Sequence, residues 1–227
     1  MAVPVSQTCS LNTLAGGIQG AKTSTNFTSY GVSAVTVMFW YQGTVNNGNV
    51  IPVSLNDNFQ ETFQFQMVAG NLNFAVRDNG AASAFSGGVL PSATIFNGSW
   101  HHFAGTYDGT NVKMYLDGVQ TGSAPGPVGG IIRTLNPAPL GIGARPPGNQ
   151  GWQGNWAQAR VFNIGLSPAQ IATEIASATA VNGSNTFDVK LDNSFASTGG
   201  YTVQSLNGAG FLCPVNPNNA LFAFGGI

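Results

Sequence analysis

Apolar and polar residues alternate over many short stretches of the chain, which is the pattern of half-buried β-strands. The clearest example is the set Val112, Met114 and Leu116, in which every second residue is apolar. Asp-Gly dipeptides at residues 108–109 and 117–118 flank this stretch, and glycine in such a pair supplies the positive φ of a tight hairpin turn. The pattern therefore predicts antiparallel strands joined by tight turns in the middle of the chain.

Other stretches are predicted to be strands because they alternate in the same way or are rich in aromatic and β-branched residues. They are residues 36–41, 63–67, 72–76, 100–107, 139–143 and 159–163. One short helix interrupts them, because Ser167, Pro168 and Gln170 form a capping box with proline in the first turn. Many short strands separated by turn signals predict an all-β antiparallel sandwich of the jelly-roll type with this one helix.

The character of the chain changes after about residue 180. Residues 186–191 and 201–206 are candidate strands, and residues 220–224 form an apolar run that we expect to be buried. We predict a sandwich domain over residues 1–180, which includes the N-terminal segment. Residues 181–227 are then a β-rich extension that packs on the sandwich or on a neighbouring subunit.

The chain has few charged residues, which excludes some classes of binding partner. Only 7% of its 227 residues are charged, and the formal net charge is −1. Seven Lys and Arg residues cannot build a basic patch for nucleic acid, and no apolar run reaches the length of a membrane span. The first residues lack the basic and apolar regions of a secretory signal. We expect a virion-surface or extracellular location, without nucleic-acid binding or membrane insertion.

Two cysteines, Cys9 and Cys213, lie near opposite ends of the chain. A disulfide between them would close a very long loop and would stabilise the fold by the entropy of that loop. The alternative, which we prefer, is two small buried residues that do not meet.

Three segments resemble the laminin-G-like, concanavalin A-like lectin/glucanase jelly rolls. Residues 35–40 are similar to an early strand of that family, residues 100–118 to its central hairpins, and residues 154–163 to its closing strand. The order and the spacing fit over about residues 18–178. This resemblance implies the jelly-roll fold, but such folds carry unrelated activities.

The resemblance makes a glucanase the first enzyme to consider. The family often has an Asp-Glu pair in the closing strand, where this chain has Ala157 and Gln158. Glycoside hydrolysis needs two carboxylates across a cleft, and the only glutamates are Glu61 and Glu174, outside the Glu-x-Asp-x-x-Glu pattern of the glucanases. We therefore predict that the protein is not an enzyme, and we place a glucanase third among its functions.

Histidine and acidic residues give little support for a metal. His101 and His102 are adjacent on a predicted strand, so they point to opposite faces and cannot act as a pair. Many relatives carry calcium at the rim of the sandwich, and Asp57 and Asp78 are weak candidates for such a site. We prefer ordinary turns at both positions, so no cofactor is predicted and calcium stays as the alternative.

Sugar-binding sites combine aromatic rings with planar polar side chains on loops. The best local candidate is formed by Arg145, Gln150 and Trp152, although Trp152 could instead pack within its own loop.

These observations predict a non-enzymatic protein that works by binding or assembly. The main hypothesis is a surface component of a virus particle, such as a bacteriophage decoration or tail-associated protein, whose partners are other virion or surface proteins in an oligomeric assembly. The alternative is a carbohydrate-binding, lectin-like module that recognises cell-surface glycans.

Overall fold

The computed structural model describes most of the chain. The described residues are 10–13, 19–28, 30–46, 48, 51–57, 60–80, 83–87, 90–127, 132–134, 138–146, 150–191, 195–206 and 209–212.

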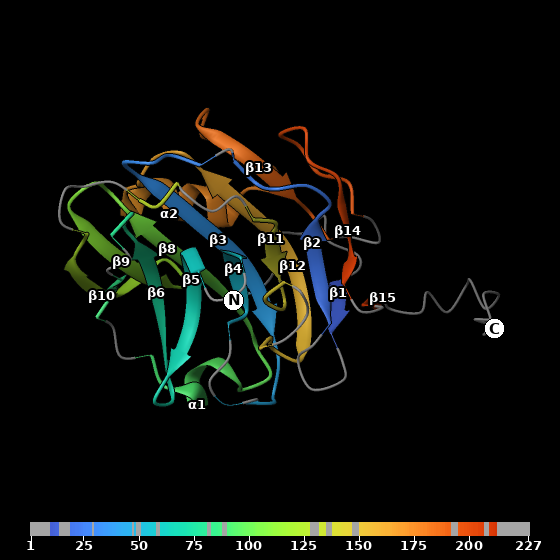
Figure 1. Ribbon diagram of the computed structural model, residues 1–227. Helices are drawn as coiled ribbons and strands as arrows, with labels where there is room; N and C mark the ends of the chain where they lie inside the picture. Colours follow the sequence, from blue (N-terminus) through green and yellow to red (C-terminus); the bar gives the residue numbers. More distant parts are fainter. Residues whose placement is uncertain are drawn as a thin grey trace, which may run out of the picture.

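Within these residues, two antiparallel sheets pack face to face as a sandwich (Figure 1). The eight-stranded sheet contains, in spatial order, β10 (Val119–Pro125), β9 (Asn111–Leu116), β8 (Trp100–Tyr107), β3 (Val35–Gln42), β12 (Gly154–Phe162), β1 (Ser10–Thr13) and β15 (Gly210–Leu212), with β13 (Asn185–Val189) also paired to β12. The seven-stranded sheet contains β14 (Val203–Leu206), β2 (Gly20–Thr23), β11 (Leu140–Ile142), β4 (Val53–Asp57), β5 (Gln60–Val68), β6 (Asn71–Arg77) and β7 (Ser83–Phe85). The predicted all-β antiparallel sandwich is confirmed.

Aromatic side chains fill the space between the sheets. Phe39 of β3 meets Phe65 of β5 edge to face, with ring centroids 4.9 Å apart, and both residues are almost fully buried. The sheets approach closely at Gly105, where a Cβ atom would lie 2.2 Å from Cγ of Phe74. Glycine at this position therefore lets the ring of Phe74 pack directly on the backbone of β8.

The two Asp-Gly dipeptides lie in turns, as the sequence predicts. Asp117 and Gly118 both have positive φ, at 52° and 83°, between β9 and β10. The carboxylate of Asp117 also accepts hydrogen bonds from the backbone N–H of His102 (2.9 Å) and binds Nδ1 of His101 (2.8 Å). The turn is thus tied to the neighbouring strand β8.

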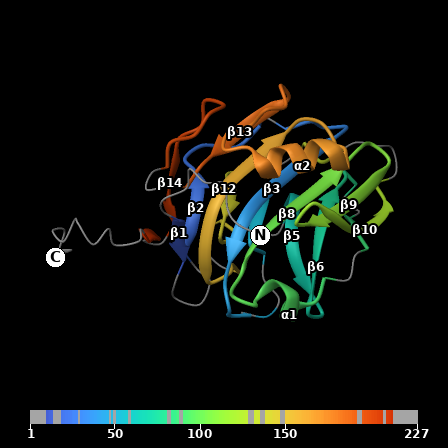
Figure 2. The same ribbon diagram turned by 180° about the vertical axis from the view of Figure 1, so that it is seen from behind.

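Helix α2 (Pro168–Ala176) lies on the outer face of the eight-stranded sheet (Figure 2). Ser167 and Gln170 form the predicted capping box at its N-terminus. Beneath the helix, Arg160 of β12 binds the carboxylate of Glu174 at 2.7 Å, and both side chains are almost fully buried. A second helix, α1 (Ser92–Ile95), has only four residues and was not predicted.

Strands from the segment after residue 180 take part in both sheets. β13 pairs with β12, β15 pairs with β1, and β14 pairs with β2. Cys9 and Cys213, which we expect not to form a disulfide, lie outside the described residues, as does the apolar run at 220–224. Among the residues that the structure does describe, no helix is long and apolar enough to cross a membrane.

Candidate functional site

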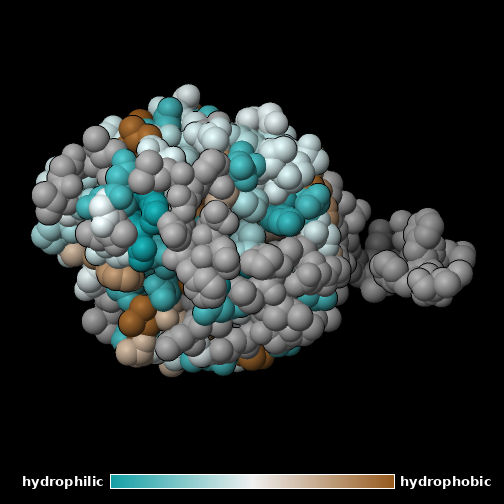
Figure 3. Space-filling model, in the orientation of Figure 1, coloured by the Kyte–Doolittle hydropathy of each residue, from teal (hydrophilic) through white to brown (hydrophobic). Residues whose placement is uncertain are grey.

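A polar groove runs over the outer face of the seven-stranded sheet. In β5, Phe63 and Phe65 point into the core, so the alternate residues Gln64 and Gln66 point outward and form part of the groove floor. Hydrophilic residues lie over β5 and β6 in the space-filling view of this side (Figure 3). Neighbouring strands thus present polar side chains from a rigid surface.

Two described residues that follow β11 in the chain, Arg145 and Gln150, form one wall of this groove. Pro146 packs over the outer face of β11, where Gly141 makes room for it, since a Cβ atom there would lie 2.4 Å from Cδ of Pro146. The backbone N–H of Ile51 donates to the carbonyl of Gln150 (2.6 Å), which fixes the far end of the wall. Gln150 has φ of 52°, a left-handed conformation that is uncommon for a residue with a side chain.

The groove has a volume of about 370 Å³, which is enough for a small saccharide. Its lining combines amide, charged and apolar side chains from four strands and two loops. They are Ile51, Asn56, Glu61, Gln64, Gln66, Arg77, Ser83, Phe85, Arg145 and Gln150.

Amide side chains form a hydrogen-bonded row along the floor. Nδ2 of Asn56 donates to Oε1 of Gln64 at 3.3 Å, and Nε2 of Gln64 donates to Oε1 of Gln66 at 3.0 Å. Each amide carries two donor hydrogens and a carbonyl oxygen that can accept two hydrogen bonds. The row fixes the orientation of these groups and gives the floor both donors and acceptors.

Charged residues meet at the β5–β6–β7 side of the groove. Nη2 of Arg77 lies 2.5 Å from Oε1 of Glu61, while Nε of Arg77 donates to Oγ of Ser83 at 3.1 Å. Arg145 is buried in the opposite wall. Burial lowers the pKa of Arg145, although the negative charge of Glu61 acts in the other direction. An arginine remains protonated at neutral pH despite such a shift.

Two of the three predicted ligand-binding residues, Arg145 and Gln150, line this groove, and Trp152 does not. Trp152 is fully buried in the core, where its ring packs 4.7 Å from Tyr41 and 5.2 Å from Phe96, measured between ring centroids. The ring therefore presents no face to an external ligand. Trp152 packs inside the protein, which is the alternative to sugar binding that the sequence left open. An exposed aromatic side chain in the groove comes instead from Phe85, at the edge strand β7.

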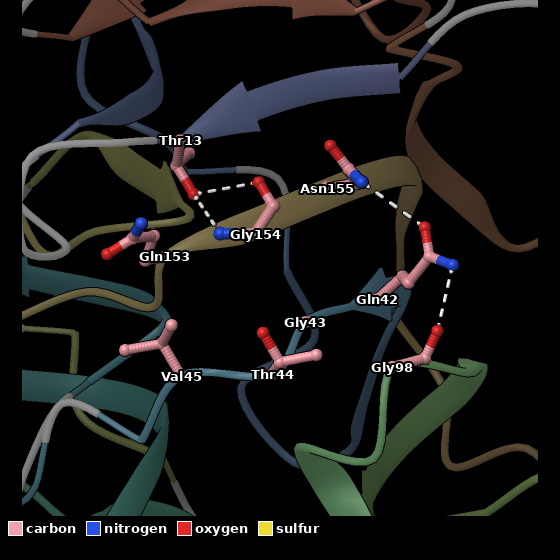
Figure 4. Close-up of a pocket in the computed structure, with 9 residues that line it drawn as sticks. All are labelled: Thr13, Gln42, Gly43, Thr44, Val45, Gly98, Gln153, Gly154 and Asn155. Atoms are coloured by element: carbon pink, nitrogen blue, oxygen red, sulfur yellow. Dashed lines mark hydrogen bonds between the residues drawn. The ribbon is translucent and has the colours of Figure 1, made fainter.

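A second hollow, of about 330 Å³, lies where β1 and β3 end and β12 begins (Figure 4). Its amides bind one another, since Nδ2 of Asn155 donates to Oε1 of Gln42 and Nε2 of Gln42 donates to the carbonyl of Gly98. Thr44 and Val45 line it from the neighbouring segment. The nine residues that line it carry no formal charge, so it offers a ligand fewer strong contacts than the groove.

The remaining candidates for metal or catalytic chemistry are dispersed. Among the described residues, no three His, Cys, Asp or Glu side chains are grouped so that they could hold a metal ion. Asp78 does not line the groove, and the side chain of Asp57 lies outside the description. His101 binds Asp117, whereas His102 packs against the ring of Trp40, so the two histidines do not converge.

Sequence reasoning missed most of the groove floor, including Glu61, Gln64, Gln66 and Arg77. The signal was present in the alternation of β5, because polar residues that alternate with buried aromatic residues must share the outer face. Which strands lie beside β5 could not be read from this alternation.

Comparison with known proteins places the chain among lectin-like jelly rolls. The family described as the concanavalin A-like lectin/glucanases superfamily matches residues 16–172. The comparison with curated protein sequences found no match.

Solved structures share the fold at low sequence identity. A candidate carbohydrate-binding protein from Bacteroides ovatus is 14% identical, with a TM-score of 0.69, and the alignment covers 92% of this chain but only 61% of that protein. A heptameric pentraxin from Limulus polyphemus is 16% identical over 90% of this chain and 96% of its own, with a TM-score of 0.58. The laminin α1 domains LG4–5 of mouse are 14% identical over 68% of this chain and 40% of theirs, with a TM-score of 0.51.

Proposed function

Because the chain belongs to the concanavalin A-like lectin/glucanase superfamily, we propose that it is a carbohydrate-binding protein without enzymatic activity and that the polar groove is its glycan site. The observation that carries this proposal is the combination of an oriented amide row, charged groups and an exposed aromatic side chain in one groove. A virion role was our main hypothesis from the sequence, but the lectin-like alternative has better support.

The chemistry of a sugar matches the groove lining. Each sugar hydroxyl both donates and accepts hydrogen bonds, and the planar amides of Gln64 and Gln66 supply both functions. The apolar face of a sugar ring packs on aromatic surface, which Phe85 supplies at the groove edge. Since the amides are held by strands of one sheet, little conformational entropy is lost when a ligand binds.

We also propose that the protein has no enzymatic activity. The argument comes from the positions of the two glutamates of the chain. Glu61 is bound to Arg77 in the groove. Glu174 is buried under α2, where it binds Arg160 and accepts hydrogen bonds from Asn182. The two glutamates therefore do not face each other across a cleft, as an acid and a base for glycoside hydrolysis would.

Glycan-array binding of the purified protein tests the proposal. Two variants, Gln66→Ala and Phe85→Ala, change partly exposed groove side chains, so they should weaken binding about tenfold without lowering the thermal unfolding midpoint. The matched control is Gln153→Ala, which makes the same amide-to-alanine change in the hollow of Figure 4. Binding that is lost in the control and kept in the groove variants would move the site to that hollow. Absence of binding to any glycan, with the protein folded, would contradict the proposed function.

A role on a virus particle stays a second prediction, motivated by the sparse charge and by the apolar run at residues 220–224. It is compatible with glycan binding. Removal of residues 213–227 should then abolish incorporation into the particle and leave glycan binding unchanged. Normal incorporation of the shortened chain would contradict an assembly role for this segment.

A further inference from the structure

The ion pair of Glu61 and Arg77 is held in a fixed geometry by a third side chain. Nη2 of Arg77 lies 2.5 Å from Oε1 of Glu61, and the side chains of Arg77 and Glu61 are 22% and 10% exposed, respectively. Ser83 is directly opposite Arg77 in the pairing of β6 and β7. Its Oγ donates to Oε1 of Glu61 at 3.3 Å and accepts from Nε of Arg77 at 3.1 Å. The three side chains therefore form a closed triangle of polar contacts that exists before a ligand binds.

Each partner of the ion pair keeps one arm that this triangle does not use. Both contacts to the carboxylate of Glu61 end on Oε1, so Oε2 has no partner among the residues that the structure describes. Arg77 uses Nε and Nη2, and within the same described residues Nη1 has no partner either. A carboxylate has about four lone-pair positions, and a guanidinium has several N–H donors in a fixed fork. The pair therefore offers a ligand one charged acceptor and one charged donor.

Both of these side chains line the groove together with the residues that we assign to the glycan. Glu61 lies in β5, the strand that also carries Gln64 and Gln66 of the amide row. Arg77 ends β6, beside the edge strand β7 that carries Phe85. A ligand in the groove therefore meets the ion pair, the amides and the aromatic ring on neighbouring strands of one sheet.

Two hydroxyl groups on adjacent carbons of a sugar ring match the unused arms of the pair. A hydroxyl both donates and accepts hydrogen bonds, so one of the two donates to Oε2 of Glu61 and the other accepts from Nη1 of Arg77. Hydrogen bonds to ionised groups are stronger than those between neutral groups. The diol itself carries no charge, so it satisfies both arms without repelling either partner.

From this geometry we propose that Glu61 and Arg77 select sugars that carry two free hydroxyl groups on adjacent ring carbons. Sugars that leave no such pair are disfavoured, such as internal hexoses linked through O3 and internal N-acetylhexosamines linked through O4. This inference rests on the proposed function and names its ligand class.

Periodate oxidation of a glycan array tests the ligand class on the native protein. Periodate cleaves the bond between two adjacent hydroxyl-bearing carbons, and borohydride then reduces the aldehydes, so the ring diol is removed. We expect the treatment to weaken binding at least about tenfold, because hydrogen bonds to charged groups are lost. Binding that survives the treatment would overturn the diol and leave carbohydrate binding standing. Absence of binding to the untreated array would overturn the proposed function itself.

A double-mutant cycle between protein and ligand then tests the contact with Glu61. The probes are the array glycan that binds best and its monodeoxy derivatives. Glu61→Gln should weaken binding of the parent glycan about tenfold to a hundredfold, because a neutral amide replaces the charged acceptor. The derivative that lacks the hydroxyl on Oε2 should bind the native protein and the variant with similar affinity. Equal weakening for the parent and for every derivative would assign Glu61 a purely structural role and overturn the contact.

Asp108→Asn is the matched control, because it also removes one carboxylate charge from an ion pair. Asp108 binds Lys113 at 2.5 Å in the turn between β8 and β9, and neither residue is part of the groove lining. The control should bind the parent glycan as the native protein does, and a loss as large as that of Glu61→Gln would overturn the inference. Thermal unfolding midpoints check that both variants fold. If Glu61→Gln does not fold, the native protein carries the test, and monodeoxy derivatives that all bind as well as the parent would overturn the inference.

Discussion

At the scale of single residues, the protein buries ionisable groups on the outer face of the eight-stranded sheet. His102 is 3% exposed, and its ring packs 5.2 Å from that of Trp40. Burial, together with the positive charge of Arg160, lowers the pKa of His102 from 6.5 to about 3. The native protein therefore holds this imidazole neutral over most of the ordinary pH range.

This shift predicts a pH dependence of folding stability. Because the folded pKa lies below the unfolded one, the unfolded chain binds more protons between about pH 3 and 6.5. The contribution of His102 is fully present above pH 6.5 and is lost as the pH falls toward 3, by roughly 1 kcal/mol per pH unit.

Urea unfolding at pH 7.5 and 5.0 measures this effect. The variant His102→Phe keeps an aromatic ring against Trp40 and should have a smaller loss of stability between the two pH values than the native protein. The same loss in both proteins would assign the pH dependence to groups other than His102.

At the scale of single elements, α2 is the element whose boundaries follow most directly from local sequence. Oγ of Ser167 accepts from the backbone N–H of Gln170, and Oε1 of Gln170 accepts from the backbone N–H of Ser167. Proline follows at the first helical position, where its missing N–H costs nothing. These contacts close a turn of four residues, so they need no tertiary information.

The variant Ser167→Ala should lower the free energy of unfolding by about 0.5–1 kcal/mol, because it removes the acceptor for an otherwise unpaired backbone N–H. We expect the lower part of that range, since the bond from Gln170 is long, at 3.4 Å. Chemical denaturation measures it, with Thr173→Ala on the exposed side of α2 as the control. A larger loss in the control than in Ser167→Ala would contradict a capping role.

The elements that sequence alone predicts well are those with local signals. The Asp-Gly turns, the strand around Met114 and the cap of α2 each depend on neighbours within a few residues. The groove does not, because it forms only when β4, β5 and β6 lie side by side and Arg145 and Gln150 come to lie beside them. Trp152 was ambiguous for the same reason, since only the packing of the sandwich places its ring in the core.

At the scale of the whole molecule, the chain beyond residue 180 completes both sheets. One edge of β12 pairs with β1 over its first residues and with β13 over its last. Phe187 of β13 is fully buried and meets Phe27 edge to face, with ring centroids 5.6 Å apart. β14 then forms an edge of the other sheet, so a single segment closes the sandwich on both layers.

A chain that ends at residue 181 should therefore lose most of its folding stability. It lacks the buried side chains of Phe187, Val189 and Leu191, and each such side chain contributes about 1.5–3 kcal/mol when it is buried. Their sum is comparable to the whole stability of a typical domain, about 5–15 kcal/mol.

A chain that ends at residue 212 keeps β13, β14 and β15 and is the reference for a chain that ends at residue 181. The comparison of the two chains by thermal unfolding separates two arrangements of the molecule. If the chain that ends at residue 181 unfolds sharply, at the same midpoint as the chain that ends at residue 212, then residues 1–180 fold as an independent domain, as the sequence predicts. A broad transition, or none, would mean that the extension is part of the sandwich core. The groove would then depend on it indirectly, because β14 supports β2 and, through it, β11, the strand from which the Arg145 wall begins.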